Sequence, residues 1–369
     1  MTTILLLIAV TLLAAAGGTA GWWLHGRRRL HGSGAVPMAR SRKIAEPAAP
    51  GQPLRQAEQA HATSSGSEIL ARMYAIAFEE EPDDDAQVNP ADALHEKIAR
   101  AAAALLSRIK PGSSYAPRRP HLLPQLLRIV NDEDSSVREI AAIIGRDPAM
   151  AGNLLRIANS VLYRVCPEPV EDIQRAVAMI GTDGLRQMIA VALMQPVLSG
   201  GRGAFARLPT IVWEHTLLAA VATAEHARKV ERKDAFTAQM LGLLHGLGSI
   251  VVVQVVRDGY SQHPGLAPDP EVVCRLLERW AARTAGRLSR DWALSTSIAP
   301  ALGDQRRDVP LRELTPLGRS LRIGQVAGAA AMLHRLGRIE VEAVFVLMQQ
   351  ELGLHEDLAA HIWERLSRA

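Results

Sequence analysis

Cysteine and aromatic residues are scarce in this chain. Only two cysteines occur among 369 residues, Cys166 and Cys274, and they form no Cys-x-x-Cys unit. This pattern excludes a disulfide framework and a cysteine-rich zinc site, and we expect two reduced, partly buried thiols. Aromatic residues make up 4% of the chain, against 48% hydrophobic residues in all. Such a composition favours packed helices over β-sandwiches.

Motifs of several functional classes are missing as well. No Gly-x-Ser-x-Gly nucleophile elbow is present, and the glycines of residues 199–203 follow no evident strand, so they complete no phosphate-binding loop. The formal charge of +4 comes mainly from arginines spread among acidic residues, without a concentrated basic face beyond residues 27–29. We therefore expect no cofactor and no nucleic-acid partner.

One long apolar run is present, at residues 4–24, and Arg27, Arg28 and Arg29 follow it directly. About 20 such residues suffice to cross a bilayer. A cleaved signal peptide carries its positive charge before the apolar region, whereas here the arginines come after it. The run therefore predicts a retained membrane anchor within residues 1–30, with the N-terminus outside and the rest of the chain in the cytoplasm.

Two regions lie between this run and the main domain. Residues 31–66 are rich in Pro, Ala, Gly, Ser and Gln and predict a flexible linker. Residues 67–116 contain two amphipathic helices, at 67–78 and 90–109, separated by an acidic break. The second carries an apolar stripe of Leu94, Ile98, Leu105 and Ile109. We expect this stripe to pack on the neighbouring domain, with self-association as the alternative.

Helix signals are dense from residue 117 onward. Ser136 and Glu139 have the spacing of a capping box, which predicts a helix that ends at Gly145. Asp147 and Pro148 predict the start of the next helix, because Asp caps free amides and Pro at the first position loses no hydrogen bond.

The end of that second helix has its own pattern. Asn159 and Ser160 follow an apolar face, and we expect them to bond backbone groups and end the helix rather than contact a ligand. A third helix is predicted to stop at Gly181. Residues 311–369 predict three more helices that complete or cap the second half of the domain, with a separate dimerising element as the alternative.

Several ordered motifs resemble the HDOD family of bacterial signalling proteins. They are LPQL at residues 123–126, AAIIGRDPAM at 141–150, NLLRIANSVLY at 153–163, IQRAVAMIG at 173–181, WEHT at 213–216 and GLLHGLG at 242–248. The resemblance includes Trp213 and implies an all-α fold, a helical bundle of two lobes at residues 117–310. It also implies a regulatory module that is related to metal-dependent HD phosphohydrolases but lacks their catalysis.

The residues of the HD pattern agree with that implication. An HD site needs histidines together with carboxylates, because a catalytic divalent metal requires neutral nitrogen and anionic oxygen ligands. His215 and His245 match two histidine positions, but Gly246 stands where the pattern has its paired aspartate. Asp291 is a weak substitute, since an aspartate before a tryptophan in a helix is more often solvated or paired with a neighbouring arginine such as Arg287 or Arg290. We therefore expect no metal and no catalytic residues.

Two interpretations of the histidines stay open at this stage. In the first, both are buried remnants, each hydrogen-bonded to a carbonyl or a hydroxyl. In the second, they line a degenerate pocket that binds a phosphorylated ligand without turning it over. The sequence predicts a single-pass protein of the bacterial inner membrane, not an enzyme, that acts by binding a protein partner or a ligand, with homodimer formation left open. The alternative is a metal-dependent phosphohydrolase of nucleotides or cyclic dinucleotides.

Overall fold

The computed structural model describes residues 66–79, 92–110, 136–146 and 205–368, together with short stretches between 113 and 181. Every regular element in these residues is helical, and none of them forms a strand, which confirms the all-α prediction for this part of the chain. The predicted anchor at residues 4–24 and the linker lie outside the described residues. Membrane attachment therefore stays a prediction.

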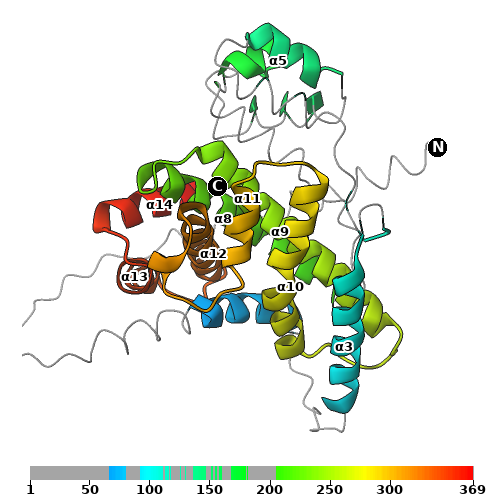
Figure 1. The fold of residues 1–369 in the computed structure, drawn as a ribbon. Coiled ribbons are helices and arrows are strands. Elements are labelled where there is room, and N and C mark those ends of the chain that lie inside the picture. Colours follow the sequence, from blue (N-terminus) through cyan, green and yellow to red (C-terminus); the bar gives the residue numbers. More distant parts are fainter. Residues whose placement is uncertain are drawn as a thin grey trace, which may run out of the picture. The chain divides into compact units, whose positions relative to one another are not determined.

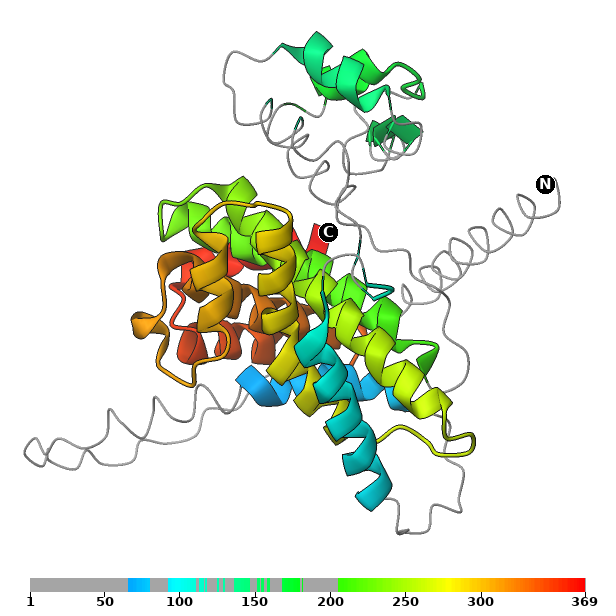
Figure 2. The same ribbon diagram turned by 45° about the vertical axis from the view of Figure 1, so that its right-hand side comes forward.

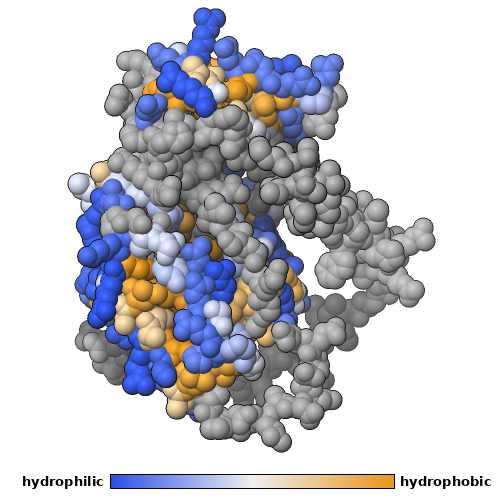
Figure 3. Space-filling view, turned by 90° about the vertical axis from the view of Figure 1, so that its right-hand side faces the viewer, coloured by the Kyte–Doolittle hydropathy of each residue, from blue (hydrophilic) through white to orange (hydrophobic). Residues whose placement is uncertain are grey.

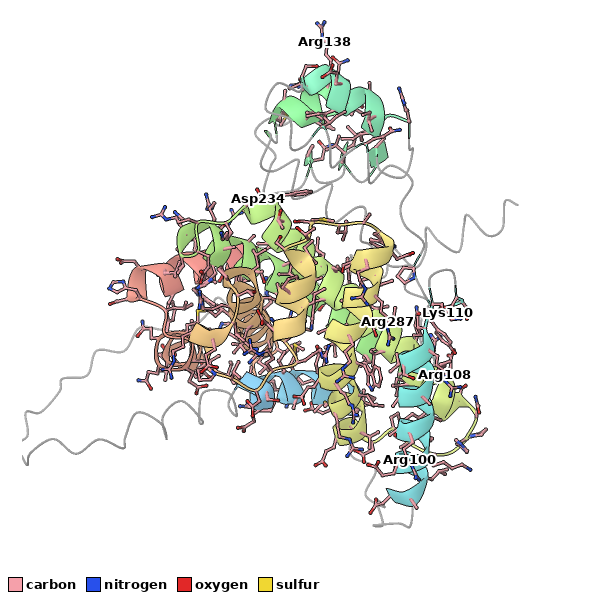
Figure 4. All side chains as sticks on the ribbon, viewed as in Figure 1. Arg100, Arg108, Lys110, Arg138, Asp234 and Arg287 are labelled. Carbon is pink, nitrogen blue, oxygen red and sulfur yellow. The ribbon has the colours of Figure 1, made fainter. Side chains whose placement is uncertain are left out.

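Four long helices build the body of residues 205–368: α8 (Leu208–Lys229), α9 (Ala235–Ser261), α10 (Pro270–Asp291) and α12 (Pro316–Arg335). Three of them begin at a capping side chain. The carboxylate of Asp234, labelled at the start of α9 in Figure 4, accepts from the amide of Thr237 at 2.7 Å. Asp269 and Thr315 cap α10 and α12 in the same way, each directly before a proline.

The helices pack in the order α12, α8, α9, α10, as Figure 1 shows. Glycine allows α12 to approach α8 closely. A Cβ atom on Gly328 would lie 2.7 Å from the amide nitrogen of Ala219, and one on Gly324 would lie 2.6 Å from the Ala219 carbonyl oxygen. Both distances are too short for any side chain, so the small-residue run of α12 brings the two backbones into contact.

Helix α9 is apolar on all sides, which is typical of a helix buried in a domain. Among the described residues it is the one helix long and apolar enough to cross a bilayer, yet 89% of its apolar window is buried inside the body. We interpret it as the core helix. The short α11 (Ile298–Asp304) and the 3-10 turn η3 (Leu311–Glu313) connect α10 to α12.

The two amphipathic helices before residue 117 pack onto this body (Figure 2). The first spans residues 66–75 and continues in η1 (Ile76–Phe78), and it buries Met73, Tyr74 and Ile76. The second, α3 (Asp92–Arg108), lies against α9 and α10. The prediction that its apolar stripe meets the neighbouring domain is thus confirmed in outline.

The composition of the α3 stripe was wrong at one position. Leu105 is 42% exposed, whereas Leu106 is fully buried together with Ile98 and Ala102. The buried face also includes His95, whose imidazole bonds the hydroxyl of Tyr260 at 2.9 Å. The other three residues of the predicted stripe do pack on the core, so only the choice between the apolar neighbours Leu105 and Leu106 was wrong.

The C-terminal helices join the same core. Helix α13 (Val341–Val346) runs into a π-helical turn, η4 (Leu347–Glu351), and α14 (Glu356–Arg368) follows. Helix α14 packs on α8 and α12, and Met348 and Ile362 are fully buried. In the described residues these helices complete the body. Figure 3 shows that hydrophilic side chains surround the apolar ones on one face of the molecule.

In the described part of residues 136–181, the helix starts and ends agree with the predicted ones. Helix α5 (Val137–Ile144) opens with the capping box of Ser136 and Glu139 and ends at Gly145. A helical stretch at residues 173–179 precedes Gly181, whose φ of +71° lies in the left-handed region that glycine adopts without strain. Within this part, Leu154 is fully buried while Leu155 is only partly buried.

Candidate functional site

The two histidines of the HD pattern come from adjacent helices. His215 lies near the middle of α8, two residues after the buried Trp213, and His245 lies in the middle of α9. Helices α8 and α9 pack against each other along their length. The fold therefore brings together the pair that the sequence pattern predicted.

His215 is a satisfied core residue. Its side chain is 2% exposed, and its Nε2 atom donates to the backbone carbonyl of Gln325 at 2.9 Å, which fixes the proton on that nitrogen. Burial lowers the pKa of His215 to about 4, although the bond to Gln325 opposes this shift. The ring of Tyr74 meets the imidazole edge-on, with centroids 6.1 Å apart. His215 thus agrees with the first interpretation, a hydrogen-bonded remnant.

His245 differs from His215. Burial and the neighbouring His215 lower its pKa to about 4, so its imidazole is neutral at physiological pH. No hydrogen bond joins that imidazole to any described residue, and the ring lines a cavity instead. The structure therefore shows no carbonyl or hydroxyl partner for His245 among the described residues, and the side chain borders the cavity.

Gly246 is explained by the packing of α8 on α9. A Cβ atom at this position would lie 2.0 Å from the Oγ1 atom and 2.1 Å from the Cγ2 atom of Thr216. Thr216 is itself 1% exposed and donates its hydroxyl proton to the Val212 carbonyl at 2.7 Å. The space that an aspartate would need beside His245 is thus filled by a side chain that is fixed in place.

The described residues supply no cluster of metal ligands in place of that aspartate. No group of three His, Cys, Asp or Glu side chains there could hold a metal ion. Asp291 is exposed at the last position of α10. The described residues offer two neutral imidazoles on adjacent helices, and this is a poor ligand set for a hydrolytic divalent metal, which needs anionic oxygen ligands as well.

The remaining predicted positions belong to the helix ends. Asp147, Pro148 and Ser160 lie outside the described residues. Asn159 donates to the carbonyls of Leu155 and Val170 at 2.8 Å each and accepts from the Val170 amide at 2.7 Å. These bonds tie the helix end to the following segment and leave little of the amide for a ligand. Cys274 is a buried thiol whose pKa burial raises to about 12.

Sequence reasoning missed an arginine-rich face on α10. Arg275, Arg279, Arg283 and Arg287 recur every fourth residue and so lie on one side of the helix. Burial, then neighbouring arginines, lower the pKa of Arg283 and Arg287.

Arg287 lies beside the end of α3 that carries Arg108 and Lys110 (Figure 4), and its guanidinium donates to the carbonyls of Leu106 and Ser107. The expectation that no basic face exists beyond residues 27–29 was wrong, because only the helical period reveals this one. The prediction that no nucleic acid binds stays a prediction.

A comparison with known protein families shows to which family this chain belongs. The HDOD domain matches residues 116–306, about half of the chain. The chain belongs to the HDOD family. The family match ends inside the helical body, so helix 66–75, α3 and the helices from α12 onward lie outside it. No curated protein matches this HDOD protein.

Solved structures resemble this HDOD protein at low identity. An HDOD domain protein of unknown function from Geobacter sulfurreducens is 19% identical, with a TM-score of 0.50 over 74% of this chain and 94% of that one. A Shewanella amazonensis SB2B protein, provisionally named a metal-dependent phosphohydrolase, is 18% identical, with a TM-score of 0.48 over 74% and 99%. At this level of identity the likeness concerns the fold alone.

Proposed function

We propose that this HDOD protein is a non-catalytic regulatory module that acts by binding. The observation that carries the proposal is the contact between Thr216 and Gly246, which fills the position of the missing carboxylate. A hydrolytic metal needs that anionic ligand and an open position for water. The two histidines have other roles: His215 bonds helix α8 to α12, and His245 faces a cavity.

We also propose that the module is attached to the bacterial inner membrane and faces the cytoplasm. The support is the uncharged run at residues 4–24 with the arginines at 27–29 behind it. The chain should stay with membranes after a high-salt wash, and a reporter fused after Ala369 should be active only in its cytoplasmic form. A periplasmic C-terminus, or a mature chain without its first residues, would reject the attachment.

Turnover measurements test the non-catalytic proposal. The purified full chain should not hydrolyse phosphomonoesters, phosphodiesters, nucleotides or cyclic dinucleotides when manganese, iron or zinc is added. The matched variant is His215→Ala, assayed in parallel. Hydrolysis by the natural chain that disappears in His215→Ala would overturn the proposal and favour a metal-dependent phosphohydrolase.

A further inference from the structure

A cavity of about 820 Å³ opens beside His245. Its wall is formed by helix 66–75, α10, the segment after α11, α12 and the turn η4. This volume lies within the range of sites that bind drug-sized molecules and cofactors. Helix 66–75 lies outside the HDOD match, so part of the wall is supplied by this chain's own N-terminal segment.

One side of the cavity is apolar. Leu70 and Tyr74 contribute from helix 66–75, Leu277 from α10 and Val326 from α12. Burial, the largest effect, raises the pKa of the Tyr74 hydroxyl, so the phenol stays neutral and adds an uncharged aromatic side chain to the lining. A ligand with an aromatic or aliphatic body would remove this surface from water.

Another part of the lining carries a cation without a contacting anion. Arg322 is partly buried on α12, and its guanidinium donates to the carbonyls of Asp304 and Arg307 at 3.0 Å each and to Gln305 Oε1 at 3.3 Å. These acceptors are all uncharged, and Arg322 forms no ion pair with any described residue. Burial lowers the pKa of Arg322, opposed by the more distant carboxylates of Asp308 and Asp304. A buried charge without a contacting counter-ion is costly, and a bound anion would offset that cost.

Charges around the cavity favour an anion at this end. Arg306, Arg307 and Arg312 also line the cavity and are exposed to solvent, and of these Arg307 pairs with Asp304. The carboxylates that line the cavity are Glu278, Asp308 and Glu351. Glu278 accepts a hydrogen bond from the hydroxyl of Ser67 at the entrance to helix 66–75. Asp308 is exposed, so its charge is well solvated.

A buried carboxylate oxygen of Glu351 also lacks a hydrogen-bond donor in the described part of the chain. Its Oε2 atom is buried and has no hydrogen-bond partner among the described residues. The neutral imidazole of His245 also faces the cavity without a protein partner. A buried acceptor of this kind is normally satisfied by an N–H or O–H group.

We propose that this cavity binds a small organic anion whose body is aromatic or apolar and carries an N–H or O–H donor. The anionic group lies against Arg322, the body lies on the wall of Leu70 and Tyr74, and the donor faces Glu351. This inference rests on the proposed function, because it assigns to the binding module the chemical class of its ligand. Complementary charge and shape give such a site its specificity.

Two matched pairs of small molecules test the proposal by titration calorimetry on the full chain. AMP carries a phosphate, a purine and donor groups, and adenosine lacks only the phosphate. Indole-3-acetate and 3-methylindole form the corresponding carboxylate pair. At least one anion should bind with 1:1 stoichiometry and at least tenfold more tightly than its uncharged counterpart. Inorganic phosphate alone should compete poorly, because it has no apolar body.

Three variants locate the site. Arg322→Gln should weaken the bound anion at least tenfold and leave its uncharged counterpart unchanged. Arg306→Gln, at an exposed rim position, should weaken the anion about two- to threefold by reducing the local positive potential. Arg279→Gln is the matched control, since Arg279 is an exposed arginine of α10 that does not line the cavity. It should have no effect.

Each outcome decides between the two proposals. If neither anion binds, if the uncharged partners bind equally well, or if Arg279→Gln weakens binding as much as the cavity variants, the ligand inference is wrong while the non-catalytic function stands. If Arg322→Gln fails to fold, the anion preference of the natural chain together with Arg306→Gln decides. If AMP is bound and converted to adenosine and phosphate, the non-catalytic function is wrong and the binding site stands.

Discussion

The two sides of the histidine pair differ in how their polar groups are satisfied. Toward the interior, His215 bonds a carbonyl, Thr216 bonds a carbonyl, and Gly246 leaves room for nothing else. Toward the cavity, His245 and Glu351 have polar atoms without described partners, and Arg322 has no contacting anion. The interior side therefore stabilises the fold, whereas the cavity side is where we propose that another molecule binds. The two sides lie close together in one helical body, and single substitutions can test each of them separately.

The largest loss of folding stability is expected when a side chain is introduced at Gly246, where Thr216 leaves no room for it. Gly246→Asp should lower the free energy of unfolding by at least about 4 kcal/mol, because its Cβ overlaps Thr216 and its carboxylate is buried without a partner. Urea unfolding of the full chain, followed by tryptophan fluorescence, measures the change.

The matched control for this substitution is a glycine with free space around it. A Cβ atom on Gly303 in α11 would meet nothing within 4 Å. Gly303→Ala should therefore be neutral or stabilise the protein by up to about 1 kcal/mol, whereas Gly246→Ala should destabilise it. Equal effects of the two alanine substitutions would contradict the close contact with Thr216.

The second largest effect is expected from acid, which should lower the free energy of unfolding by protonating histidines. Burial lowers the pKa of His215, His226 and His245 to about 4, from about 6.5 in an unfolded chain. Each binds a proton more weakly when folded, so its contribution is complete above pH 6.5 and is lost as the pH falls toward 4. At pH 5.5 the loss should be on the order of 1 kcal/mol per histidine.

Urea unfolding at pH 7.5 and pH 5.5 checks this linkage. Glu225 is a reference with the same sign in a lower pH window: burial raises its pKa, but its hydrogen bonds with Arg228 and His361 outweigh burial and lower it. Its stabilisation is lost only below about pH 4.5. A free energy of unfolding that is constant between pH 7.5 and 5.5 would show that the pKa values of these histidines are not lowered in the folded chain.

The histidines themselves should differ from each other. His215→Ala should cost about 1–3 kcal/mol, because it leaves the buried Gln325 carbonyl without its donor. His245→Ala should cost less than about 1 kcal/mol, since no described protein group loses a partner. Paired melting curves of the two variants are sufficient, and a larger loss for His245→Ala would mean that His245, rather than His215, stabilises the core.

A further effect, at the level of one methyl group, concerns the side chain that fills the carboxylate position. Thr216→Ser keeps the hydroxyl bond to Val212 and removes the methyl group beside Gly246. It should cost about 1 kcal/mol, the loss of one buried methyl group. An unchanged free energy of unfolding would mean that the methyl group does not pack against α9.

Sequence patterns predicted the helices better than the site. The capping box of Ser136 and Glu139 acts over three residues, so it can be read locally, and the paired histidines follow from an ordered motif. The role of Gly246 could not be read in this way, because its neighbour Thr216 lies 30 positions earlier on another helix. Tyr74, Arg322 and Glu351 reach the cavity from three separate segments, and no local spacing connects them.

The α10 arginines give a different lesson. Their period of four was present in the sequence, but a count of charges along the chain does not reveal it. Leu105 and Leu106 show the same limit at finer scale, since both are apolar neighbours and only packing decides which one is buried. Periodicity therefore predicts that a helix has a buried face more reliably than it identifies every residue on that face.

Metal content tests the central claim most directly. Full-length protein purified without chelator, and then equilibrated with manganese, iron or zinc and desalted, should contain far less than one equivalent of each metal by elemental analysis. His215→Ala should give the same low value. One equivalent of metal in the natural chain, lost in both His215→Ala and His245→Ala, would contradict the account, because it would place a metal where the Thr216 side chain closes the site.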